Sequence, residues 1–234
     1  MSILENNKMK KAVLFRASGF VGSELLLKLL NNPIYEEVTI VVRKPLNSTH
    51  PKLRILIGDF NSMPGLIEKI SADTVFIALG AIQNSRQNSD EFYQIDHDYP
   101  VIAAKILKEN GAKSVFLVTA AGANPNSKFR YIKTKGETER DIIALDFEFT
   151  HIFRPTMIVG NRKDKRPFEK IGMKIWKLIH PVFIGRQTDY KEIDAKEIAK
   201  AMNNASLNQT EKVKIYNWKE MKFYSNSKEQ ITLV

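Results

Sequence analysis

A glycine-containing turn joins an apolar strand to an apolar helix near the start of this chain. Residues 11–15 read Lys-Ala-Val-Leu-Phe, the turn reads Arg16-Ala-Ser-Gly-Phe-Val-Gly22, and an apolar helical pattern continues to Leu30. A helix that begins directly after such a turn presents free backbone N–H groups and the positive end of its dipole to an anion. In doubly wound α/β sheets this arrangement binds the diphosphate of a dinucleotide. The turn therefore predicts that fold class and that kind of site.

The turn departs from the usual Gly-x-x-Gly-x-x-Gly spacing at its first position. Gly19 and Gly22 match the pattern, but Arg16 replaces the first glycine. Gly19 would let the backbone approach the phosphates, and Gly22 would let the helix pack on the strand. Two interpretations of Arg16 stay open: its guanidinium neutralises the diphosphate, or its bulk narrows the cleft and weakens binding. A glycine turn without any ligand is a third reading.

The rest of the chain alternates strand and helix patterns. The runs rich in Val, Ile, Leu and Phe predict strands over 11–15, 37–43, 53–57, 73–79, 113–119, 147–153 and 212–217. Helices are expected over 19–31, 64–70, 90–110, 128–145, 168–179 and 194–206. Such alternation indicates a parallel sheet with right-handed crossovers, a Rossmann fold. We expect one domain over residues 1–234, with 155–194 as a small substrate-side lid or extension.

Composition excludes several classes of protein. The chain has 234 residues, no cysteine and 43% hydrophobic residues, so disulfides, thiolate zinc sites and thiol catalysis are excluded. The mean hydropathy is −0.28, no apolar run is long enough to span a membrane, and the first ten residues lack the apolar centre of a signal peptide. These features predict a soluble cytoplasmic protein. The four histidines lack metal-ligand spacing, so no metal site is expected.

Positive charge is concentrated in one segment. The net charge is +10, and residues 161–177 hold seven cations (Arg162, Lys163, Lys165, Arg166, Lys170, Lys174 and Lys177) and two anions (Asp164 and Glu169), a balance of 7 − 2 = +5. Such a patch can attract nucleic acid or anionic lipid. A solvated loop and helix face is the preferred interpretation. The apolar stripe of the helix expected at 168–179 indicates core or an interface, which leaves oligomerisation open.

Charged residues after the second and third strands bear on the choice of cofactor. Arg43 ends the second strand and Lys44 follows it; cations here favour the 2′-phosphate of NADP, whereas an acid would bind the ribose of NAD. Asp59 follows the third strand, next to Phe60. Its carboxylate could accept a hydrogen bond from an adenine amino group, or it could cap a turn.

A tyrosine and a lysine four residues apart form the candidate catalytic pair. Tyr131 and Lys135 share one helix face, and a nearby ammonium lowers the pKa of a phenol and favours proton exchange near neutral pH. Such a tyrosine can give a proton to a carbonyl oxygen while a nicotinamide supplies hydride. Tyr224 and Lys228 have the same spacing but lie in a polar tail. Thr119 ends the fifth strand, so its hydroxyl is expected at the same cleft as Tyr131.

These motifs occur together in the order expected of one family. Taken with Ala78-Leu-Gly80, Ile95-Asp-His-Asp-Tyr99, Tyr131-x-x-x-Lys135-Gly-Glu137 and Phe153-Arg-Pro155, they resemble the atypical short-chain dehydrogenase/reductases, in the branch of Tat-interacting-protein-like NAD(P)-binding oxidoreductases. The resemblance covers most of residues 10–206. It implies a Rossmann fold, a preference for NADP(H) over NAD, and a Ser/Thr–Tyr–Lys constellation.

Carried over to this chain, the resemblance assigns the catalytic roles to Thr119, Tyr131 and Lys135. The residues expected to bind the cofactor are Arg16, Ser18, Gly19, Phe20, Val21, Arg43, Lys44, Asp59, Phe60, Ala78, Leu79, Gly80, Pro155 and Met157. The family's position filled here by Thr119 is more often serine, and the threonine methyl narrows the pocket. The first hypothesis is an NADP-dependent reductase of a small carbonyl compound. The second is a regulatory protein that binds NAD(P) without redox chemistry.

Overall fold

The computed structural model describes residues 9–80, 89–160 and 191–227. Seven parallel strands form the main sheet in the order β3-β2-β1-β4-β5-β6-β9, and β7 and β8 pair separately. The strands are β1 (Lys10–Phe15), β2 (Tyr35–Val42), β3 (Leu53–Ile57), β4 (Thr74–Ile77), β5 (Ser114–Val118), β6 (Phe149–Phe153), β7 (Met157–Val159), β8 (Glu192–Asp194) and β9 (Val213–Tyr216). The expected doubly wound Rossmann sheet is thereby confirmed.

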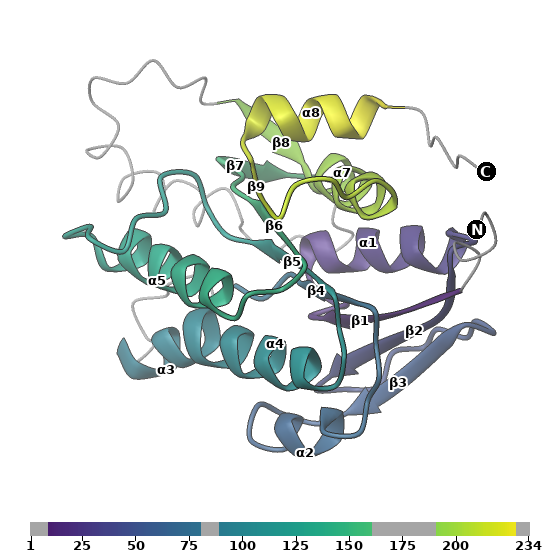
Figure 1. The fold of residues 1–234 in the computed structure, drawn as a ribbon. Helices are drawn as coiled ribbons and strands as arrows, with labels where there is room; N and C mark the ends of the chain where they lie inside the picture. Colours follow the sequence, from purple (N-terminus) through teal and green to yellow (C-terminus); the bar gives the residue numbers. More distant parts are fainter. Residues whose placement is uncertain (1–8, 81–88, 161–190, 228–234) are drawn as a thin grey trace, which may run out of the picture.

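Helices cover both faces of this sheet (Figure 1). They are α1 (Phe20–Asn31), α2 (Met63–Ile67), α3 (Ser89–Tyr93), the π-helix η1 (Gln94–Asp98), α4 (Tyr99–Glu109), α5 (Arg130–Ala144), α7 (Ala195–Leu207) and α8 (Trp218–Asn226). Helices α1, α7 and α8 pack on one face, and α2, α4 and α5 pack on the other. No helix of the described ranges is long and apolar enough to cross a membrane.

The central strands are apolar along their whole length because both faces of the sheet are covered. Leu14 of β1 and Phe76 of β4 belong to the core beneath α1 and α7, whereas Val13 and Val75 belong to the core beneath α4 and α5. The side chains of a strand alternate between its two faces, so each strand contributes to both cores. This explains why the sequence shows continuous apolar runs instead of polar alternation.

The strand order reverses direction between β1 and β4. The chain runs outward from β1 to β2 and β3, then returns to β4 on the other side of β1 and continues through β5 and β6. The loops that leave the carboxyl ends of β1 and β4 therefore separate toward opposite faces. A crevice at this reversal is where ligands bind in open parallel sheets.

Several local expectations need correction. The helix expected over 90–110 is interrupted by η1, and the pair β7–β8 was not predicted. The polar tail that contains Tyr224 forms helix α8, which Asn217 caps by accepting from the N–H of Lys219 at 2.9 Å. Residues 168–179, together with the basic segment 161–177, lie outside the described residues. Of the expected extension 155–194, the structure describes only 155–160 and 191–194.

Candidate cofactor and active site

The N-terminus of α1 has the features of an anion site. Gly19 is the N-cap residue, no side chain caps the helix, and its first turn holds no acidic residue. The N–H groups of the first turn and the helix dipole therefore favour a negative charge there. A Cβ on Gly22 would lie 2.9 Å from the carbonyl carbon of Arg16 and closer still to its oxygen. The glycine thus lets the first helical turn pack against the β1 turn itself.

Arg16 spans the two loops that diverge at the sheet reversal. Its backbone φ is +64°, a left-handed conformation that favours glycine, which explains why glycine suits this position. Its Nη1 donates a hydrogen bond to the carbonyl oxygen of Gly80, after β4. A Cβ on Gly19 would lie 2.9 Å from Arg16 Cγ and 3.0 Å from Nε. The arginine side chain therefore lies over the N-terminus of α1, beside the anion site.

The neighbouring turn residues pack around this site. Ser18 is exposed and Val21 is buried. A Cβ on Gly160, after β7, would lie 2.8 Å from Cζ of Phe20, so the Phe20 ring closes against that segment. The N–H of Ala78 donates to Phe15 O at 3.4 Å, and Leu79 is buried.

The residues after β2 and β3 differ in their surroundings. Arg43 and Lys44 are exposed, directly beyond the carboxyl end of β2. Asp59 accepts hydrogen bonds from the N–H groups of Asn61 at 3.1 Å and Ser62 at 2.9 Å. These bonds, those to Ser62 foremost, lower the pKa of its carboxyl group. The structure thus supports the turn-capping interpretation of Asp59.

Phe60 packs against Tyr99, the first residue of helix α4. Its ring stacks on that of Tyr99, with 4.0 Å between ring centroids and an interplanar angle of 5°. Pro155 is buried and its carbonyl accepts from the N–H of Ala121 at 2.9 Å. Met157 begins β7 and pairs with Glu192 of β8. Pro155 and Met157 therefore lie in the segment that leaves the carboxyl end of β6.

Lys135 is buried at the carboxyl edge of the sheet. Its Nζ lies 3.3 Å from Oδ1 of Asp96, and the two side chains are 5% and 0% exposed. A Cβ on Gly80 would lie 3.5 Å from the same Nζ. Gly80 therefore meets Lys135 of α5 on one side and accepts from Arg16 on the other. The structure brings the α1 turn, the end of β4 and helix α5 to one point.

Tyr131 lies one turn before Lys135, and the Lys135 Nζ is 5.9 Å from the centroid of its ring. Burial raises the pKa of the Tyr131 phenol, and the negative charge of Asp96 raises it further. The sequence predicted the opposite direction, because it paired Tyr131 with Lys135 and did not place Asp96 beside them. At neutral pH Tyr131 is therefore a protonated phenol, able to donate a proton.

The hydroxyl of Thr119 is held by a buried carboxylate. Thr119 is 6% exposed, and its Oγ1 donates to Oε1 of Glu139 at 2.5 Å. Glu139 also accepts from Nε of Arg154 at 3.0 Å. Sequence reasoning missed Glu139, although it continues the four-residue spacing of Tyr131 and Lys135 along α5. This carboxylate ties the ends of β5 and β6 to the helix that carries the candidate pair.

Within the three described ranges, no group of three or more His, Asp or Glu side chains could hold a metal ion. Two cationic side chains lie next to Gly80: Arg16 donates to its carbonyl oxygen and the Lys135 Nζ would lie 3.5 Å from its added Cβ. The Arg16 side chain also lies next to Gly19, the N-cap residue of α1.

Comparison with known families and proteins agrees with this geometry. A family model described as NAD(P)H-binding matches residues 17–174. The chain is 32% identical over 203 residues to "Protein FMP52, mitochondrial" of Candida glabrata, covering 84% of this chain and 87% of the relative. It is 32% identical over 206 residues to "Protein fmp52, mitochondrial" of Aspergillus fumigatus, covering 85% and 88%.

Solved structures share the fold at low sequence identity. A UDP-N-acetylglucosamine 4-epimerase from Methanobrevibacter ruminantium, in complex with UDP-N-acetylmuramic acid, has a TM-score of 0.66 and 21% identity, covering 90% of this chain and 76% of the other. A short chain dehydrogenase family protein from Francisella tularensis has a TM-score of 0.61 and 15% identity, covering 94% and 100%. These structures confirm the Rossmann fold that the resemblance to short-chain dehydrogenase/reductases implied.

The relatives also correct one expectation. The sequence predicted a cytoplasmic protein from its polar N-terminus and its lack of membrane-length apolar runs. The curated relatives from Candida glabrata, Saccharomyces cerevisiae and Aspergillus fumigatus are all named mitochondrial. The cytoplasmic prediction is therefore wrong, because neither hydropathy nor the absence of a secretory pattern distinguishes these two compartments.

Proposed function

The chain belongs to the NAD(P)H-binding family, and from this premise we propose that it is an NADP-dependent oxidoreductase that reduces a small carbonyl compound. The observation that carries the proposal is the meeting of three elements at Gly80. The turn before α1 supplies Arg16, the end of β4 supplies the Gly80 carbonyl, and α5 supplies Lys135. A dinucleotide that lies across the sheet reversal would contact all three.

The residues of the site fit a diphosphate and a nicotinamide ribose. The uncapped α1 N-terminus would accept the diphosphate, with the guanidinium of Arg16 close enough to pair with it after releasing the Gly80 carbonyl. Lys135 would bind the ribose hydroxyls from the opposite side of Gly80. Pro155 and Met157 would flank the nicotinamide. When bound, the cofactor supplies a hydride to the carbonyl carbon.

The protein's own residues would supply the proton and the orientation. Tyr131 is protonated at neutral pH and would give its phenolic proton to the carbonyl oxygen as the hydride reaches the carbon. The Thr119 hydroxyl donates its hydrogen bond to Glu139, so its oxygen would accept a hydrogen bond from a substrate hydroxyl. In this arrangement Thr119 would orient the substrate by accepting a hydrogen bond.

Arg43 and Lys44 support the preference for NADP over NAD. Both side chains are exposed beyond the end of β2, where the adenine ribose lies in this fold. Arginine binds a phosphate through two parallel hydrogen bonds. The 2′-phosphate would thus find two cations, whereas the exposed Asp59 is occupied with capping its own turn.

Binding and turnover measurements test this function. We expect calorimetric titration to show saturable binding of NADPH, tighter than that of NADH. Loss of NADPH absorbance with a panel of small aldehydes and ketones should fall in Tyr131→Phe. Tyr224→Phe is the matched control, because Tyr224 has the same spacing to a lysine but lies on α8. The proposal is refuted if neither cofactor binds below about 1 mM, an interaction of about 4 kcal/mol.

A second function is favoured by the position of Arg16. Because its side chain lies over the α1 N-terminus, the chain could bind NAD(P) as a regulatory protein without redox chemistry. The Arg16→Gly variant distinguishes the two roles of this residue. Tighter NADPH binding in the variant would mean that the native side chain obstructs the site, and weaker binding would mean that it is a phosphate ligand.

Location and assembly complete the proposal. We expect the protein to be mitochondrial, because its FMP52 relatives are named mitochondrial. We also expect its substrate to be a small molecule and do not expect it to bind nucleic acid. Cell fractionation tests the location. Light scattering tests whether the chain forms an oligomer.

A further inference from the structure

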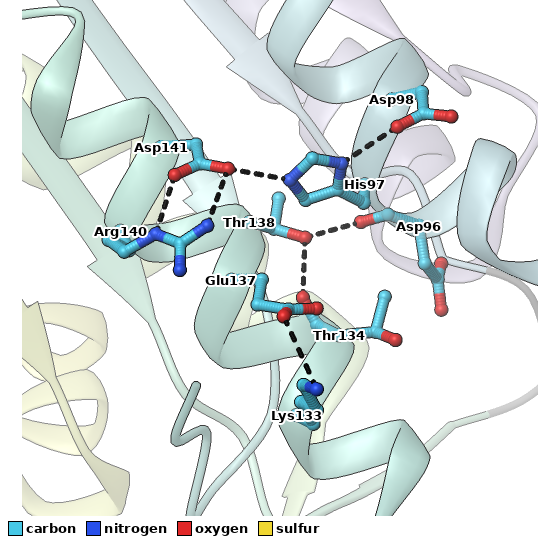
Figure 2. Close-up of polar contacts among 9 residues, drawn as sticks. All are labelled: Asp96, His97, Asp98, Lys133, Thr134, Glu137, Thr138, Arg140 and Asp141. Atoms are coloured by element: carbon cyan, nitrogen blue, oxygen red, sulfur yellow. Dashed lines mark hydrogen bonds and ion pairs between the residues drawn. The ribbon is translucent and has the colours of Figure 1, made fainter. Parts of the chain in front are cut away.

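The π-helix η1 is bonded to α5 at three points, and Figure 2 shows two of them, those made by Thr138 and by His97. The Asp96 carboxylate pairs with Lys135. The Thr138 hydroxyl lies 2.8 Å from the carbonyl oxygen of Asp96. Nε2 of His97 lies 2.8 Å from Oδ2 of Asp141, while its Nδ1 lies 2.8 Å from Oδ1 of Asp98. An inserted π turn, a feature common at functional sites, is thus bonded through Asp96 and His97 to the helix that carries Tyr131.

Asp96 is the central residue of this fastening. It is 1% exposed, and a buried carboxylate is costly unless a cation pairs with it. Lys135 is equally buried and would be costly without Asp96. Each charge therefore fixes the position of the other. Their common neighbour is Gly80, whose added Cβ would lie 3.5 Å from Lys135 Nζ and 3.8 Å from Asp96 Oδ1.

We propose that Asp96 is a positioning residue of the redox site: its carboxylate holds the Lys135 ammonium beside Gly80 and opposes the loss of the Tyr131 proton. This inference rests on the proposed function. It assigns η1 a role that neither the helix expected over 90–110 nor the Tyr-x-x-x-Lys spacing indicated. Asp96 acts through Lys135 and Tyr131 and does not itself contact the reacting atoms.

The electrostatics follow from the charged groups that face Tyr131. Lys135 of α5 favours ionisation of the phenol, and Asp96 of η1 opposes it. Arg16, from the turn after β1, donates to the carbonyl oxygen of Gly80. Burial and the charge of Asp96 together raise the pKa of Tyr131. Removal of the Asp96 charge would leave the Lys135 charge uncompensated, so Tyr131 would ionise at lower pH.

Tyrosine-selective NMR on the full chain tests the proposal without cofactor. The ring signal of Tyr131 is identified by its absence in Tyr131→Phe. In the native chain this signal should titrate at a higher pH than that of a free phenol, and in Asp96→Asn it should titrate at a lower pH than in the native chain. An unchanged titration in Asp96→Asn overturns the proposal. Because no cofactor is present, this result is independent of whether the chain binds NADPH.

Two further variants separate positioning from stability. Thr138→Val removes the hydroxyl contact between η1 and α5 but leaves both charges, so Tyr131 should titrate as in the native chain. Asp96→Glu keeps the charge and displaces Lys135. It should leave the Tyr131 titration unchanged and raise the Kd for NADPH roughly tenfold, as expected when a charged hydrogen bond is misplaced.

These variants also carry the test if Asp96→Asn does not fold. Native NADPH affinity in Asp96→Glu would then overturn the proposal. A Tyr131 phenol that ionises at lower pH in Thr138→Val than in the native chain would also overturn it. If the native chain binds no NADPH, the proposed function fails. The titrations would still decide whether Asp96 controls Tyr131.

Discussion

Substitution of Gly136 by alanine should destabilise the fold and disturb the site. Gly136 follows Lys135 on α5, where that helix crosses the segment after β5. A Cβ there would lie 2.6 Å from the Cα of Asn124, and closer still to the Asn124 carbonyl carbon and the Pro125 nitrogen. These neighbours are backbone atoms. The N–H of Asn124 also donates to the carbonyl of Ile132 at 3.1 Å, which fixes the segment to the same helix.

The magnitude follows from two opposing terms. Overpacking costs about 1–3 kcal/mol, and the upper end applies because no flexible side chain can yield here. Alanine in a helix gains about 1 kcal/mol over glycine. We therefore expect Gly136→Ala to lower the free energy of unfolding by about 2 kcal/mol. For a chain of this size, that corresponds to a fall in Tm of roughly 4–8 °C.

Gly65 provides the matched control. It lies on helix α2 (Met63–Ile67), and a Cβ there would meet nothing within 4 Å. Gly65→Ala should keep or raise the Tm, by at most about 2–4 °C. Thermal unfolding followed by circular dichroism compares the two variants. If Gly136→Ala unfolds at or above the native temperature, the packing argument at this crossing is wrong.

The remaining predictions concern stability and cofactor choice. Burial lowers the pKa of His151 to about 4. Below about pH 6.5, the usual pKa of histidine, the unfolded chain therefore binds more protons than the folded chain. The free energy of unfolding should decrease as the pH is lowered, by at most about 1.4 kcal/mol per pH unit. In urea titrations at several pH values, His151→Gln should flatten this dependence. Asn217→Ala removes the cap of α8 and should cost about 1 kcal/mol in the same assay. In calorimetric titrations, Arg43→Ala should weaken the binding of NADPH about tenfold and leave the binding of NADH unchanged. The control Arg54→Ala, on β3, should alter the binding of neither cofactor. An equal loss for both cofactors in Arg43→Ala would contradict the assignment of Arg43 to the 2′-phosphate.

Local sequence patterns were sufficient for most of the architecture. The apolar runs predicted all seven strands of the main sheet, because a strand covered on both faces must be apolar throughout. The Gly19 turn predicted where α1 begins. Helix α8 was missed because its surface is largely polar, although Asn217 followed by Glu220 is a capping signal that could have indicated it.

Local sequence patterns predicted the candidate site only in part. The four-residue spacing placed Tyr131 and Lys135 on one face of a helix, and this depends only on helix geometry. The spacing indicated neither the burial of Tyr131 nor the nearby charge of Asp96, so the direction of the Tyr131 pKa was predicted wrongly. The spacing also did not show that the Thr119 hydroxyl donates a hydrogen bond to Glu139.

By itself, the sequence determined which segments are strands or helices and which residues share a helix face, because both follow from interactions between near neighbours along the chain. Only the tertiary structure decided which charges meet. Asp96 reaches Lys135 through a π turn whose position depends on how α4 and α5 pack against the sheet, and Arg16 reaches Gly80 because β1 lies beside β4. The strength of such pairs depends on distance and burial, and both are properties of the packed chain rather than of its local pattern.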